Sequence, residues 1–154
     1  MPITTSSTDR IEKEITLDAP RSRVWRALTD SAEFGTWFGV RLEGPFRVGE
    51  RIQGAITEPG YRHLTFVAWV EAMEPERHFA FRWQPHAMDP AVDYSGDPTT
   101  LVRFDLTDVD GGTHLRVTES GFDGLPAEHR AEAFLRNGGG WTAQMENIKT
   151  HVDD

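Results

Sequence analysis

The residue with the clearest potential for chemistry in this sequence is a single acidic side chain, Glu119. In the strand predicted around it, Glu119 shares a face with Leu115 and Val117, so its carboxylate is expected to point toward the apolar side of a sheet. A carboxylate in such a place can serve as an acid, as a base or as a polar anchor for a ligand. The simpler interpretation, which we expect, leaves Glu119 at the rim of the strand in water.

Other catalytic and metal-binding patterns are missing from the sequence. It has no Cys, which excludes disulfides, thiolate metal sites and a Cys nucleophile. Its six His residues include no pair spaced by four and no HExxH motif, so neither a metal nor another cofactor is predicted. Ser120 does not belong to a G-x-S-x-G motif, because Thr118 replaces the first Gly. Glu119 is therefore the one candidate catalytic residue.

Aromatic side chains are the second kind of candidate. The chain contains nine Phe and five Trp, several of them at predicted inward positions. Trp83 and Trp141 carry indole N–H donors that need partners when buried, and such donors can also serve a ligand. For Trp141 we expect a place in the core. The candidate ligand-binding residues are Trp37, Phe38, Phe81, Trp83, Phe104, Val117, Glu119, Phe134, Trp141 and Met145.

Composition and charge restrict the partners. The chain of 154 residues suits one domain, expected over residues 9–154 after a flexible arm over residues 1–8. Its 16 basic and 25 acidic residues give a net charge of −9, which repels phosphate, so no nucleic-acid partner is expected. No apolar run approaches the roughly 18 residues of a membrane span, and no secretory signal precedes residue 10, so the prediction is a cytoplasmic protein without membrane insertion.

The elements that must position these residues follow an unusual order. Alternating apolar residues predict a strand over Arg10–Leu17, and Pro20 marks the start of a helix over Arg21–Thr29. Ser31 is expected to cap a second short helix. Strands are then predicted at 40–43, 51–57, 63–73, 79–83, 101–109 and 112–120. The strand over 63–73 is apolar on both faces, so its inward face is left open.

The hairpin over Leu101–Ser120 can be assigned residue by residue. An Asp110–Gly111 turn fixes the register, since this pair is typical of two-residue hairpin turns. The resulting cross-strand pairs are Leu106 with Leu115, Phe104 with Val117, Val102 with Glu119 and, on the other face, Asp105 with Arg116. Before this hairpin, the long segment 84–100 has no periodicity and is either a plain connection or a lid.

The last segment, 126–152, carries an apolar stripe with helical spacing. The stripe consists of Ala127, Ala131, Phe134, Gly138, Trp141, Met145, Ile148 and Val152. Gly138–Gly140 interrupts it, and each Gly within a helix costs roughly 0.5–1 kcal/mol relative to Ala. We therefore expect either two helices or a close approach of the backbone to another group. One helix, about 10 Å across, cannot cover a broad curved sheet, which leaves a cavity.

Several short segments resemble the START-related (SRPBCC) superfamily, in its Aha-type branch, which is named for an activator of the ATPase of heat-shock protein ninety. In chain order these are Leu17-Asp18-Ala19-Pro20, Val24-Trp25-Arg26-Ala27-Leu28-Thr29-Asp30, Phe46-Arg47-Val48-Gly49-Glu50, Glu74-Pro75-Glu76-Arg77, Phe81-Arg82-Trp83, Glu119-Ser120-Gly121-Phe122 and Gly140-Trp141. The resemblance implies an α+β helix-grip fold. In that fold, a curved antiparallel sheet of six or seven strands surrounds a long C-terminal helix, with two short helices after the first strand.

The resemblance leaves the function open, because superfamily members use the cavity for lipid carriage, hormone sensing, ring cyclisation or co-chaperone work. We expect a non-catalytic carrier or sensor of a small apolar or amphipathic ligand, or a stress-related role. The alternatives are an enzyme of the cyclase or hydrolase kind with Glu119 as acid or base, and a co-chaperone-like interaction module with a chaperone partner. Members of such families often pair, so a homodimer is a further expectation.

Overall fold

The computed structural model describes residues 9–59, 64–85, 91–94 and 96–153. The predicted flexible arm, residues 1–8, lies outside the described residues. The elements, in chain order, are β1 (Arg10–Leu17), α1 (Arg21–Thr29), α2 (Ser31–Phe38), β2 (Val40–Leu42), β3 (Arg51–Ile56), β4 (Thr65–Glu74), β5 (His78–Trp83), β6 (Thr100–Val109), β7 (Gly112–Ser120), the 3-10 turn η1 (Phe122–Gly124) and α3 (Ala127–Asp153).

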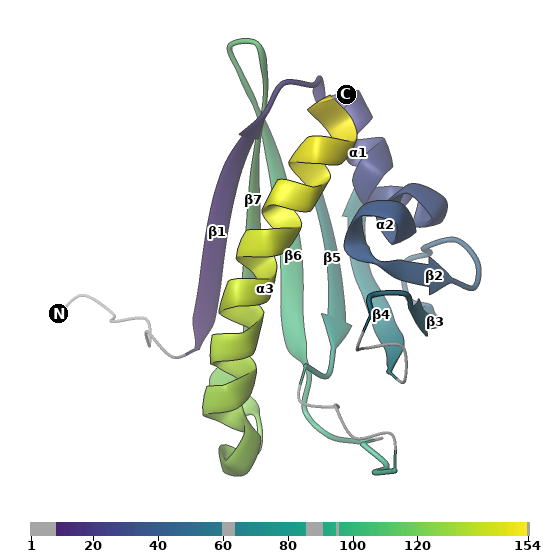
Figure 1. Ribbon diagram of the computed structural model, residues 1–154, viewed down its shortest axis with the longest axis vertical. Coiled ribbons are helices and arrows are strands. Elements are labelled where there is room, and N and C mark those ends of the chain that lie inside the picture. Colours follow the sequence, from purple (N-terminus) through teal and green to yellow (C-terminus); the bar gives the residue numbers. More distant parts are fainter. Residues whose placement is uncertain (1–8, 60–63, 86–90, 95, 154) are drawn as a thin grey trace, which may run out of the picture.

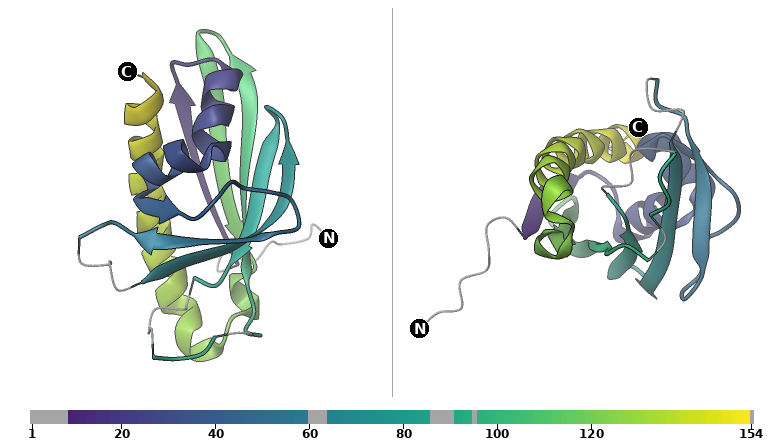
Figure 2. Two further views of the ribbon diagram at one scale, coloured as in Figure 1. Left: turned by 90° about the vertical axis from the view of Figure 1, so that its right-hand side faces the viewer. Right: turned by 90° about the horizontal axis from the view of Figure 1, so that it is seen from below.

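A curved antiparallel sheet of seven strands carries the fold, in the order β1-β7-β6-β5-β4-β3-β2. The long helix α3 crosses the concave face of this sheet. The short helices α1 and α2 pack beside the C-terminal half of α3 (Figures 1 and 2). The α+β helix-grip architecture predicted from the sequence is confirmed, with seven strands rather than six.

The register of the last hairpin is also confirmed. Val109 pairs with Gly112 across the Asp110–Gly111 turn, and Val102 pairs with Glu119. The other predicted pairs are present as well: Leu106 with Leu115, Phe104 with Val117 and Asp105 with Arg116. In β4, where both faces are apolar, the inward residues are Phe66, Ala68 and Val70.

The short helix α2 begins one residue earlier than expected. The side chain of Asp30, not that of Ser31, caps it by accepting hydrogen bonds from the backbone N–H groups of Ala32 and Glu33. Gly39 ends the helix at a φ of 92°, a left-handed conformation that Gly adopts without a steric penalty. This tight ending lets the chain turn directly from α2 into β2.

Of the two alternatives expected at Gly138–Gly140, a break into two helices is wrong, because α3 runs without a break from Ala127 to Asp153. A Cβ atom added at Gly138, Gly139 or Gly140 would meet no described atom within 4 Å outside the helix, so no close backbone approach explains the three glycines. The buried residues of α3 are Ala133, Trp141, Met145, Ile148 and Val152. Ala127 and Ala131 are exposed, because the first turns of α3 extend past the end of β1 (Figure 1).

Aromatic rings fill much of the space between the sheet and the helices. Phe34 of α2 lies at the centre of one group, with ring centroids 4.9 Å from Trp37 and 6.4 Å from Phe81. Phe79, Phe81 and Phe104 are fully buried beside it. The large aromatic side chains therefore form a packed core under the middle of the sheet.

An ion-pair cluster joins the C-terminal end of α3 to α1 and α2. The Glu33 carboxylate lies 2.6 Å from Arg23, 2.8 Å from Arg26 and 2.9 Å from His151. Burial alone raises the pKa of Glu33. Hydrogen bonds from His151 and Arg23, the charge of Arg23 and a hydrogen bond from Arg26 outweigh burial and hold this pKa below its ordinary value of 4.5.

The lowered pKa gives a pH-dependent contribution to stability. A carboxyl whose pKa is depressed in the folded state stabilises the fold above its unfolded pKa, and this stabilisation is lost as the pH falls through the folded value. We therefore expect the difference in free energy of unfolding between the wild type and Glu33→Gln to shrink as the pH falls below 4.5. Urea unfolding at several pH values measures it. A difference that does not change with pH contradicts the assignment.

Candidate functional site

Glu119 is completely buried, so the expectation that it lies at the rim in water is wrong. Four hydrogen-bond donors surround its carboxylate. One oxygen accepts from Trp83 Nε1 at 2.7 Å and from Thr100 Oγ1 at 2.5 Å. The other oxygen accepts from Asn137 Nδ2 at 2.9 Å and from Trp141 Nε1 at 2.8 Å.

This arrangement uses the hydrogen-bonding capacity of the carboxylate fully. An ionised carboxylate accepts about four hydrogen bonds through its two oxygens, and indole nitrogens act only as donors. Glu119 thereby links β7 to β5 through Trp83, to β6 through Thr100 and to α3 through Asn137 and Trp141. A buried charge is tolerated where such hydrogen bonds replace water, so these four donors account for a carboxylate beneath the helix.

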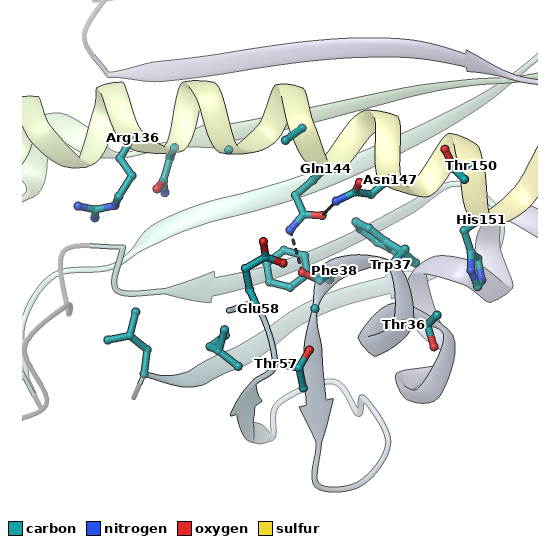
Figure 3. Close-up of a pocket in the computed structure, with 16 residues that line it drawn as sticks. Thr36, Trp37, Phe38, Thr57, Glu58, Arg136, Gln144, Asn147, Thr150 and His151 are labelled. Carbon is teal, nitrogen blue, oxygen red and sulfur yellow. Dashed lines mark hydrogen bonds between the residues drawn. The ribbon is translucent and has the colours of Figure 1, made fainter. Parts of the chain in front are cut away.

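An open groove of about 990 Å³ lies beside the packed core. Its walls are α3 on one side and the end of α2 with the chain around β2 and β3 on the other (Figure 3). Gln144 reaches across from α3 and donates from Nε2 to the carbonyl of Phe38 at 2.9 Å, while its own oxygen accepts from Asn147 at 3.0 Å. Two aromatic side chains, Trp37 and Phe38, line the groove, and nine of its sixteen lining residues are polar or charged.

A smaller pocket of about 100 Å³ adjoins this groove. Its lining residues are Phe38, Trp83, Asn137, Gly140, Trp141 and Gln144, and four of these also line the groove. The three aromatic rings lie close together, with centroid separations of 5.8 Å for Trp83–Trp141, 6.1 Å for Phe38–Trp83 and 6.2 Å for Phe38–Trp141. Because Gly140 has no side chain, the helix leaves this pocket open.

The structure separates the predicted ligand-binding residues into three groups. Trp37 and Phe38 line the groove, and Phe38, Trp83 and Trp141 line the pocket, with Glu119 bonded to both indoles. The residues that are buried in the core and line neither space are Phe81, Phe104, Val117 and Met145. Phe134 lies apart from both, with its ring centroid 5.3 Å from that of Phe122 in η1.

Sequence reasoning missed Asn137, Thr100, Gly140 and Gln144. A signal existed for Asn137, since it stands four residues before Trp141 and therefore on the same face of α3. Thr100 carried no such signal, because it lies at the end of a long segment without periodicity. Trp141 was expected to be a core residue and is one, but its partner is the Glu119 carboxylate rather than a backbone carbonyl.

Within the described ranges, no group of three or more His, Asp or Glu side chains could hold a metal ion. Of the described helices, none is both long and apolar enough to cross a membrane.

A seven-stranded sheet that grips one long helix, with a groove beside that helix, defines a helix-grip protein of the START-related type. Residues 18–153 match the model of the family described as Activator of Hsp90 ATPase homolog 1-like protein, so the chain belongs to this family. The resemblance noted in the sequence is thereby confirmed. Among proteins of curated function, none matches the chain.

Several solved structures are similar to this chain. Protein MLL2253 from Mesorhizobium loti is 26% identical, with a TM-score of 0.73 over 94% of this chain and 96% of its own. The Aha1 dimer from Colwellia psychrerythraea is 19% identical, with a TM-score of 0.69 over 94% and 96%. DynU16, a putative protein in the dynemicin biosynthetic locus, is 23% identical, with a TM-score of 0.71 over 94% of this chain and 47% of its own. The last two are similar in fold alone.

Proposed function

We propose that this protein binds a small apolar or amphipathic molecule, without transforming it, in the groove between α3 and the α2–β3 side of the fold. The observation that carries the proposal is the groove of about 990 Å³ beside a pocket walled by Phe38, Trp83 and Trp141. Clefts of roughly 300–1,000 Å³ are typical of small-molecule sites. Here the pocket supplies the aromatic walls, and most of the side chains that line the groove are polar.

Gly140 adds support to this proposal. Each Gly within a helix costs roughly 0.5–1 kcal/mol relative to Ala, so three consecutive glycines weaken α3. Neither packing nor backbone conformation requires them, because an added Cβ at Gly138, Gly139 or Gly140 meets open space. Gly140 lines both the groove and the pocket, and a side chain there would occupy space available to a ligand.

A neutral fluorescent probe tests the proposal. N-phenyl-1-naphthylamine, which brightens in apolar surroundings, is expected to bind with a saturable increase in emission and a stoichiometry of one. By linkage, a ligand at 100 times its Kd adds about 2.7 kcal/mol to the free energy of unfolding, so the melting temperature is expected to rise with probe concentration. If this probe gives neither a saturable signal nor a thermal shift, the proposal is wrong.

The catalytic alternative, with Glu119 as acid or base, draws no support from the geometry. All four hydrogen bonds of the carboxylate go to protein donors. Glu119 also belongs to the lining of neither the groove nor the pocket. A general base must come within hydrogen-bond reach of the proton that it removes, which here requires a protein donor to leave first.

The remaining expectations stay predictions. A homodimer is consistent with the Aha1 dimer from Colwellia psychrerythraea, which has a similar fold. The chaperone partner, the stress-related role and the cytoplasmic location have no structural observation of their own in this chain. Sedimentation across a concentration series measures directly whether the homodimer forms.

A further inference from the structure

The orientation of one amide group beside the small pocket is fixed by Glu119. Asn137 donates from Nδ2 to the Glu119 carboxylate at 2.9 Å. Only the nitrogen of an amide can donate to such an acceptor, so the Asn137 oxygen must occupy the other position. Asn137 is half-buried and lines both the groove and the pocket, and within the described ranges its amide oxygen has no hydrogen-bond donor.

The other polar side-chain atoms of the pocket each make at least one hydrogen bond within the protein. The indole N–H groups of Trp83 and Trp141 donate to Glu119. Gln144 uses its nitrogen for the Phe38 carbonyl and its oxygen for Asn147. Of the side-chain nitrogen and oxygen atoms in the described pocket lining, the Asn137 oxygen is thus the one that makes no hydrogen bond, and it is an acceptor.

The charges around the pocket argue against an anionic ligand group. The buried Glu119 carboxylate lies directly behind Asn137, Trp83 and Trp141, and a like charge in a low-dielectric site is disfavoured. Arg136, the arginine among the described residues of the groove lining, donates to the Pro85 carbonyl and lies 3.8 Å from Glu132. It is therefore already engaged at the rim.

The size and walls of the pocket suit one ring. Its volume is about 100 Å³, and it adjoins the much larger groove. An engineered apolar cavity of about 150 Å³ takes up benzene, so a ring in this smaller pocket extends partly into the groove. Aromatic rings pack favourably at centroid separations of about 4.5–7 Å, so a ring between Phe38, Trp83 and Trp141 gains contacts on several sides, while further parts of the ligand extend into the groove.

We propose that the pocket recognises a neutral ring that carries a hydrogen-bond donor, of the phenolic hydroxyl type, with the donor placed on the Asn137 oxygen. This proposal rests on the proposed ligand-binding function and specifies its ligand. The buried Glu119 acts as a positioning residue, because it orients the Asn137 amide and both indoles without itself touching the pocket.

Three naphthalenes that differ at one position test the inference at pH 7. The probe 2-naphthol is neutral and donates, 2-methoxynaphthalene keeps the ring system without the donor, and 2-naphthoate is anionic. Dissociation constants come from the indole N–H signals of the five Trp residues, where those of Trp83 and Trp141 are expected to shift. A neutral hydrogen bond corresponds to a preference for 2-naphthol over 2-methoxynaphthalene of about 3- to 10-fold, and 2-naphthoate is expected to bind most weakly.

A variant pair connects the preference to Asn137. Asn137→Ala is expected to bind 2-naphthol and 2-methoxynaphthalene equally, whereas Thr142→Ala, which is exposed on the same helix and lines neither the groove nor the pocket, keeps the preference. If Asn137→Ala does not fold, the wild-type series decides alone. Equal binding of all three probes to the wild type overturns this inference and leaves the proposed function intact. If no probe shifts the indole signals but dilution does, a second copy covers the groove, and both proposals fail.

Discussion

Replacing Glu119 by Gln is expected to lower the free energy of unfolding by about 1–3 kcal/mol, although the two side chains have nearly the same shape. The amide oxygen of Gln can serve the donors at one end of the site only. The amide nitrogen at the other end faces Trp83 or Trp141, whose indole N–H groups cannot accept a hydrogen bond. At least one buried indole donor is then left without a partner.

Glu119→Leu extends the same test, because a Leu side chain offers no acceptor to any of the four donors. It is therefore expected to cost more than Glu119→Gln. Glu12→Gln on β1 is the matched control: Glu12 is exposed and lies 3.5 Å from Arg116, and such a surface pair contributes about 0–1 kcal/mol. Urea unfolding followed by Trp fluorescence measures all three. Equal stabilities for Glu119→Gln and Glu12→Gln contradict the structural role assigned to Glu119.

The hairpin over 101–120 could be predicted in detail because its signals are local and agree. The Asp110–Gly111 turn, the apolar face and the Asp105–Arg116 pair each indicate the same register, and that register is present. The prediction that Glu119 lies in water was wrong for the opposite reason. Its inward direction followed from the period of the strand, but its burial depends on donors 18 to 36 residues away along the chain, and a single sequence does not reveal these partners.

The prediction for the C-terminal helix was wrong in a different way. Helix propensity is a weak prior that tertiary packing overrides, and here Trp141, Met145, Ile148 and Val152 hold α3 against the core beyond the glycines. The predicted stripe was correct where the sheet lies beneath the helix and wrong at Ala127 and Ala131, where no strand lies beneath it. Periodicity predicts which face of a helix is apolar, but it does not predict how far the neighbouring sheet extends.

The sequence predicted a cavity beneath the long helix, because one helix cannot cover a broad curved sheet. The groove in the structure lies beside this helix instead. The sheet is indeed broader than its one long helix, but Phe34, Phe81 and Phe104 fill the space beneath its centre. The groove among the described residues lies toward α2 and β3, where Phe38 and Gly140 line it. Whether large inward side chains line a cavity or fill it depends on their mutual packing, which inward position alone does not determine.

Gly139→Leu and Gly140→Leu are expected to have similar effects on stability, but only Gly140→Leu is expected to weaken ligand binding. Both positions are exposed in the middle of α3, and a Cβ at either meets no described atom within 4 Å outside the helix. Since Leu forms helix better than Gly, each substitution is expected to raise the free energy of unfolding by about 0.5–1 kcal/mol.

Binding separates the two variants, because Gly140 lines the pocket and the groove whereas Gly139 lines neither. A Leu side chain at 140 occupies space that the ligand ring needs, and excluding one ring from an apolar pocket costs roughly 1.5–3 kcal/mol, or about 10- to 100-fold in Kd. Titrating N-phenyl-1-naphthylamine into both variants measures the effect, with Gly139→Leu expected to bind like the wild type. Equal affinities for the two variants would place the ligand elsewhere, since they differ only in which way the added side chain points from the same helix.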